Sequence, residues 1–103
     1  MLPTPEECFI IGSHIINPRE YTIANARGEV KNLKTRELEL LKYFHKHPNS
    51  VVTREELFAS VWNAQKFAIT RTVDQHVATV RKLLEEDGPC IETIIRVGYF
   101  YRV

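Results

Sequence analysis

The chain has 103 residues, 44% of them hydrophobic, with 14 Lys plus Arg against 13 Asp plus Glu. This length predicts a single domain, and the apolar content and balanced charge exclude a disordered chain. The apolar runs are far shorter than the roughly 20 residues that span a bilayer. Residues 1–7 carry no signal-peptide pattern and are expected to be a linker or leader before one domain of residues 8–103. The two cysteines, Cys8 and Cys90, are too few for a disulfide framework, so we expect a reducing, cytoplasmic location.

The first third of the chain has the pattern of a small antiparallel sheet. Short β-branched and aromatic runs recur about every eight residues, separated by Gly, Asn and Pro. Four strands are therefore predicted, at residues 9–11, 14–16, 21–23 and 29–33.

Two helices are predicted after this sheet. Apolar residues recur at helical spacing over residues 35–47, and residues 50–52 then form a short extended link. Thr53 followed by Glu56 has the sequence of a capping box and begins a second helix that ends near Asn63.

A third helix is predicted over residues 71–86, with a stop at Asp87-Gly88-Pro89. Its apolar positions are spaced four, three and four residues apart and form one narrow stripe: Val73, Val77, Val80 and Leu84.

The opposite face of this third helix has the character of a DNA-reading surface. It carries Arg71, Gln75, Ala78, Thr79 and Lys82. Short residues at its centre permit close approach to a major groove, and Gln, Arg and methyl-bearing side chains can contact base edges. Residues 63–82 hold four cations and one acid, Asp74, although an ordinary solvated face would share this composition.

The C-terminus is predicted to be a hairpin of residues 91–95 and 99–103. Two helices, a loop, a basic helix and a hairpin in this order indicate a helix-turn-helix followed by a wing, an α+β fold. Arg96, beside Gly98 at the hairpin tip, is suited to the negative potential of a minor groove.

Several motifs together resemble the winged-helix effector domain of OmpR/PhoB-type response regulators over residues 9–103. They are Leu33-x-x-x-Glu37-Leu38-x-Leu40-Leu41, Val52-Thr53-Arg54-Glu55-Glu56-Leu57 with Trp62, Arg71-Thr72-Val73-Asp74-x-His76-Val77-x-x-Val80-Arg81-Lys82-x-Leu84, Thr93-Ile94 and Gly98-Tyr99. The resemblance implies a four-stranded N-terminal antiparallel sheet, three helices and a C-terminal hairpin wing at about residues 94–99. It also implies sequence-specific binding of double-stranded promoter DNA, homodimers on direct repeats, and a receiver domain of a two-component phosphorelay.

The resemblance assigns roles to individual residues as well. Groove-facing positions correspond to Ala78, Thr79 and Lys82, base or phosphate contact to Arg81, and backbone contact to Arg71 and Thr72. The Trp62 indole would donate to a phosphate, Thr93 and the wing tip would meet the minor groove, and residues 63–70 would contact RNA polymerase. The predicted DNA-binding set is Arg71, Thr72, Gln75, Ala78, Thr79, Arg81, Lys82, Trp62, Lys66, Thr93 and Arg96.

The sequence departs from the family pattern at three places. Many relatives have basic residues where this chain has Ala78 and Thr79, so their base preference does not transfer. Arg96 is shifted by one residue from the usual Arg-Gly of the wing tip, which within a strand would reverse its side. Thr35 is expected to cap the first helix one residue late.

No catalytic, metal or cofactor motif is present in this sequence: the glycines lie at separate turns, and the histidines and cysteines lack ligand spacing. We therefore expect no enzyme. Two alternatives to a response regulator stay open. One is a winged-helix module that contacts RNA polymerase or a partner domain, which the near-neutral charge favours. The other is the DNA-binding domain of a ToxR-like membrane-anchored regulator.

Overall fold

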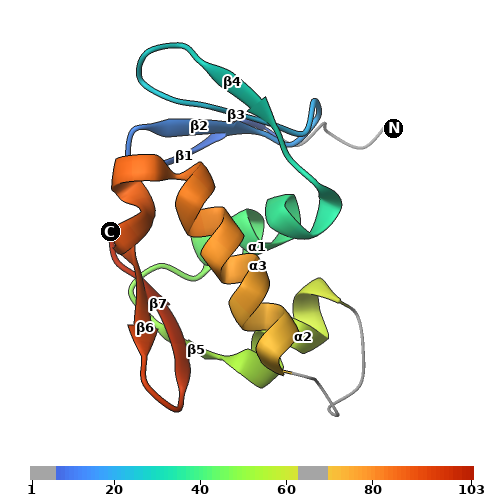
Figure 1. The fold of residues 1–103 in the computed structure, drawn as a ribbon, viewed down its shortest axis with the longest axis vertical. Helices are drawn as coiled ribbons and strands as arrows, with labels where there is room; N and C mark the ends of the chain where they lie inside the picture. The colour runs from blue at the N-terminus through green and yellow to red at the C-terminus, as the bar shows by residue number, and fades with distance from the viewer. Residues whose placement is uncertain (1–6, 63–69) are drawn as a thin grey trace.

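The computed structural model describes residues 7–62 and 70–103, which form helices packed between two small antiparallel sheets (Figure 1). The predicted α+β winged helix-turn-helix is confirmed. Most of the predicted leader at residues 1–7 and most of the loop at residues 63–70, Lys66 included, lie outside the described residues.

The first sheet has the order β1-β2-β3-β4 and is antiparallel throughout. Its strands are β1 (Phe9–Ile11), β2 (His14–Asn17), β3 (Thr22–Ala24) and β4 (Val30–Asn32), close to the four predicted runs. Side chains alternate across it as strand geometry requires. Ile11, Ile16 and Ile23 are buried on the inner face, whereas Ile10 and Ile15 pair across the strands on the outer face and are exposed.

Two helices follow this sheet in the sequence. Helix α1 spans Thr35–Lys46 and α2 spans Arg54–Val61. The predicted cap of α2 is confirmed, because the Thr53 hydroxyl accepts a hydrogen bond from the Glu56 N–H at 3.1 Å.

The predicted cap of α1 is wrong. Thr35 is already the first residue of the helix, and Lys34 occupies the N-cap without a side-chain cap bond. Glu37 accepts the Lys34 N–H at 2.9 Å, so only this half of a capping box is made. A lysine at this position offers no acceptor to the free helix amides and places a cation at the positive end of the helix.

The predicted extended link at residues 50–52 lies largely within a strand of residues 51–53, and the sequence pattern did not predict that this segment joins a sheet. Strand β5 (Val51–Thr53) pairs with β7 (Gly98–Tyr101), and β7 pairs with β6 (Ile91–Ile94), giving the order β5-β7-β6. Gly98 permits this close pairing, since a Cβ there would lie 2.0 Å from the Val52 carbonyl oxygen. The predicted hairpin therefore forms two strands of a three-stranded sheet.

Helix α3 spans Thr70–Leu83, about three residues shorter at its end than predicted. Glu85 adopts φ 52° and breaks the helix, and residues Glu85–Cys90 form a 3₁₀ turn that contains Asp87-Gly88-Pro89. The predicted stop at residues 87–89 thus comes too late, because the break is made at Glu85 by contacts with the first sheet.

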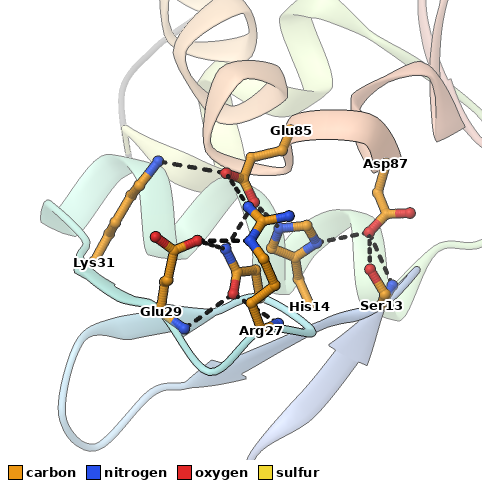
Figure 2. A network of polar contacts seen from close by, with 8 residues as sticks. Ser13, His14, Arg27, Glu29, Lys31, Glu85 and Asp87 are labelled. Atoms are coloured by element: carbon orange, nitrogen blue, oxygen red, sulfur yellow. Dashed lines mark hydrogen bonds and ion pairs between the residues drawn. The ribbon is translucent and has the colours of Figure 1, made fainter.

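These contacts form a polar clamp, defined as Ser13, His14, Asn25, Glu85 and Asp87, between the first sheet and the end of α3 (Figure 2). The buried His14 ring directs Nδ1 to Asp87 at 2.6 Å and Nε2 to Glu85 at 3.2 Å. Each ring nitrogen of His14 therefore lies within hydrogen-bond distance of a carboxylate oxygen. Asp87 also accepts the Ser13 N–H at 2.9 Å and the Ser13 hydroxyl at 2.7 Å.

The two acids of the polar clamp are stabilised in their charged forms. Burial raises the pKa of Asp87, but hydrogen bonds from Ser13 and His14 outweigh it, so that pKa is lowered. Hydrogen bonds from Asn25 and His14 likewise lower the pKa of Glu85. Their contribution to stability is complete above the pKa of an unfolded carboxyl, about 4, and is lost as the pH falls through the lowered folded values.

We predict that Asp87→Asn lowers the free energy of unfolding at pH 7 by about 1–3 kcal/mol, because it removes a charged acceptor from the buried His14. The difference from wild type should begin to shrink below about pH 4, where the carboxyl of the unfolded chain takes up a proton, and should disappear as the pH falls through the lowered pKa of folded Asp87. Urea unfolding at several pH values measures both effects. Glu86→Gln, at an exposed neighbour, is the control. A variant as stable as this control at pH 7 would contradict the assignment.

Candidate nucleic-acid interface

Helix α3 divides cleanly into a buried side and an exposed side. Its apolar stripe has no solvent exposure at any of four positions: Val73, Val77, Val80 and, just after the helix, Leu84. Burying each such side chain stabilises the fold by about 1.5–3 kcal/mol, so the helix cannot rotate about its axis without a large loss. The five polar or small residues predicted to face outward are all exposed: Arg71, Gln75, Ala78, Thr79 and Lys82.

The centre of the exposed face of α3 carries short side chains, and one of them is held against the helix by a hydrogen bond. The Thr79 hydroxyl donates to the Gln75 carbonyl oxygen one turn earlier at 3.2 Å. This bond holds the Thr79 side chain against the helix. Ala78 beside it adds only a methyl group. Arg71 and Lys82 stand at the two ends, so the face offers cations on either side of a shallow centre.

Arg81 connects α3 to the wing. Its Nε and Nη2 donate to the Ile91 carbonyl oxygen at 2.9 and 2.7 Å, and Nη2 also donates to the Thr93 hydroxyl at 2.7 Å. The guanidinium carbon lies 5.4 Å from the centre of the Tyr99 ring. Arg81 and Thr93 therefore hold the helix and hairpin at a fixed relative position, and their predicted DNA contacts stay a prediction.

A second connection between α3 and the wing includes the single acid of the basic segment. Asp74 accepts a hydrogen bond from Arg54 Nε at 2.8 Å and another from the Tyr99 hydroxyl. Burial raises the pKa of Asp74, but these bonds outweigh it and lower that pKa. Burial, together with the bond to Asp74, raises the pKa of Tyr99 to about 12. The charge of Asp74 is thus neutralised by Arg54 rather than left on the exposed face.

Sequence reasoning missed these partners of Asp74. The one sign of these partners in the sequence is Asp74 itself, a single acid in an otherwise basic segment. Arg54 and Tyr99 lie 20 and 25 residues away, so no local pattern connects them to Asp74. Tyr99 is only 3% exposed, so its hydroxyl reaches Asp74 from within the core.

The tip of the wing is a tight turn that exposes Arg96. The Val97 N–H donates to the Ile94 carbonyl oxygen at 2.9 Å, which closes the turn. Arg96 lies between the two strands, so the alternation of side chains within a strand does not decide its direction. Its φ of 67° lies in the left-handed region, which costs a residue with a side chain about 1–2 kcal/mol. Nothing in the described fold uses the Arg96 side chain.

Trp62, at the end of α2, packs mainly inside the domain. Its ring stacks on Phe58 with centroids 5.5 Å apart and packs nearly perpendicular to the His76 ring with centroids 5.0 Å apart. The Arg36 guanidinium carbon lies over the Trp62 ring, 5.7 Å from its centre. The predicted contact of the Trp62 indole with a phosphate stays a prediction.

The described part of the chain holds no group of three or more His, Cys, Asp or Glu arranged to bind a metal ion. None of its helices combines the length and the apolar character needed to cross a membrane.

Comparisons with known proteins agree with this geometry. Residues 28–101 match the family model described as "Transcriptional regulatory protein, C terminal". The uncharacterized transcriptional regulatory protein YclJ of Bacillus subtilis (strain 168) is 40% identical over 95 residues, which are 90% of this chain and 39% of that protein. The chain therefore spans about two fifths of the length of this relative.

Solved structures share the fold at lower identity. The DNA-binding domain of Escherichia coli CadC superposes with a TM-score of 0.83 at 28% identity, covering 97% of this chain and 95% of that one. The DNA-binding domain of the response regulator AdeR, in complex with an intercistronic region, gives 0.73 at 27% identity, covering 91% and 98%. Because the family model covers most of its length, this chain belongs to the transcriptional regulatory protein C-terminal family, the OmpR/PhoB-type DNA-binding domains.

Proposed function

We propose that this domain binds double-stranded promoter DNA sequence-specifically, with α3 in the major groove and the wing tip at the adjacent minor groove. The observation that carries this proposal is the exposed polar face of α3, whose apolar side is completely buried. The dimensions of an α-helix match a B-DNA major groove. A relative at 27% identity is described in complex with an intercistronic region, which supports the same use of this fold.

The exposed face supplies two kinds of contact. Gln75 and Thr79 at its centre read base edges, with the methyl group of Ala78 beside them, whereas Arg71 and Lys82 neutralise phosphates. Arg96 enters the minor groove, and its strained backbone supports this role because no contact within the described fold offsets the strain.

The wider setting is also a proposal. Solved structures described as response regulators, at 27% and 28% identity, support a role as the effector domain of a two-component regulator that controls transcription in the cytoplasm. Contact of residues 63–70 with RNA polymerase and homodimer formation on direct repeats rest on family resemblance. The DNA-bound relative favours DNA binding over a module that contacts only proteins.

Thr79→Ala is expected to reduce discrimination between a preferred duplex and a scrambled one by about 1–3 kcal/mol, because it removes a base contact. Arg71→Ala should weaken binding to both duplexes about equally, since a phosphate contact carries no sequence information. The preferred duplex is first selected from random sequences, and fluorescence anisotropy then gives the affinities. Equal losses on both duplexes for Thr79→Ala would rule out its base-reading role.

Arg96→Gly is expected to weaken DNA binding while leaving the free energy of unfolding unchanged or raising it by up to about 1 kcal/mol, since glycine accepts a positive φ. Arg96→Asn, which also tolerates this conformation but lacks the charge, should weaken binding to a similar extent. Thermal unfolding and anisotropy titrations measure the two properties separately. The proposal fails for Arg96 if both variants bind DNA like wild type.

A further inference from the structure

A cleft of about 300 Å³ lies between the start of α1 and the flank of α3 opposite the wing. It is lined by Lys34, Thr35, Arg36, Glu37, Gln75, His76 and Thr79. Gln75 and Thr79 also belong to the exposed face of α3, so the cleft continues the proposed DNA surface. Figure 1 shows the chain entering α1 on one side of α3 and the hairpin on the other side.

The α1 side of this cleft presents a cation and a hydroxyl. Glu37 is only 8% exposed, and its carboxylate accepts the Lys34 N–H at 2.9 Å. Arg36 uses Nη1 to donate to the Val61 carbonyl oxygen at 2.8 Å. Lys34 and Thr35 are both exposed, and within the described residues Lys34 forms no ion pair. On this side of the cleft the Lys34 ammonium and the Thr35 hydroxyl are available to a ligand, together with the Arg36 N–H groups that the Val61 carbonyl oxygen does not use.

The α3 side of the cleft is a fixed wall. His76 Nδ1 donates to the Thr72 carbonyl oxygen at 2.8 Å, and its ring packs nearly perpendicular to the Trp62 ring with centroids 5.0 Å apart. Thr79 is held by its bond to the Gln75 carbonyl oxygen at 3.2 Å. Both walls thus keep their shape without a ligand, and a group entering the cleft needs little rearrangement of the protein.

We infer that this cleft binds a backbone phosphate of the duplex that α3 reads, through the Lys34 ammonium and the Thr35 hydroxyl. A helix in a major groove has a sugar-phosphate strand on each flank. The wing occupies one flank of α3, and the cleft lies on the other. Placing a lysine at the N-cap of α1 costs helix stability, which a contact with an anion outside the fold explains. The inference rests on the proposed function.

Lys34→Gln is expected to weaken binding to preferred and scrambled duplexes equally, by about two- to tenfold, and to reduce the slope of log K against log salt concentration by about 0.9. Lys46→Gln, at the last residue of the same helix, makes the same charge change away from the cleft and should have little effect. If wild type binds duplex DNA but the two variants bind alike, the inference is overturned while the proposed function stands. If wild type binds no duplex, the proposed function fails with it.

Replacing single phosphates of the preferred duplex by neutral methylphosphonates locates the contact. One position should weaken wild-type binding but leave Lys34→Gln binding almost unchanged, because that variant has already lost the interaction. Additive losses at every position would overturn the inference.

Lys34→Ser separates binding from folding. Serine is a preferred N-cap residue, so this variant should melt at a higher temperature than wild type and yet bind DNA more weakly. A stabilised variant that keeps wild-type affinity would show that Lys34 does not contact the phosphate.

Discussion

Complete burial of one side of α3 is the constraint on which this domain depends. Val73, Val77 and Val80 have no exposure, so the direction of every other side chain on the helix is fixed. The opposite face is left to solvent, and no described element covers it. The two connections to the wing, through Arg81 and Asp74, then fix where the hairpin lies relative to that face. A DNA-reading surface needs this rigidity, because base edges are distinguished by hydrogen bonds of defined geometry.

The chain is nearly neutral as a whole, but several of its acidic side chains are bound to partners within the domain. Glu37 caps α1, Asp74 pairs with Arg54, and Glu85 and Asp87 hold His14. These four carboxylates are engaged within the domain, whereas Arg71 and Lys82 are exposed on α3. The surface that α3 presents is therefore more positive than the net charge of +1 indicates. This explains how a domain with a balanced composition can be suited to a polyanion.

Local patterns in the sequence predicted most of the elements. The stripe of α3, the four-stranded meander and the Thr53 cap depend on residues a few positions apart, where periodicity and capping chemistry apply directly. Features set by distant residues were not predictable in this way. Strand β5 exists because β7 pairs with it, and α3 ends early because Glu85 turns toward His14, 71 residues away.

The same distinction applies to the candidate site. Helical geometry alone placed Gln75, Ala78 and Thr79 on the outer face, as the structure confirms. The internal bonds of Arg81 could not be predicted, because they depend on how the hairpin folds back beside the helix. The α1 cleft was missed for a similar reason: Lys34 and His76 come together only through the packing of α1 against α3.

Amide chemical-shift mapping during titration with duplex DNA tests the central claim most directly, because it reports on every part of the domain at once. The account predicts the largest changes along residues 71–82 of α3 and at the wing tip, with small changes on the four-stranded sheet. Changes confined to residues 63–70, with none on α3, would contradict it and favour a surface for protein partners.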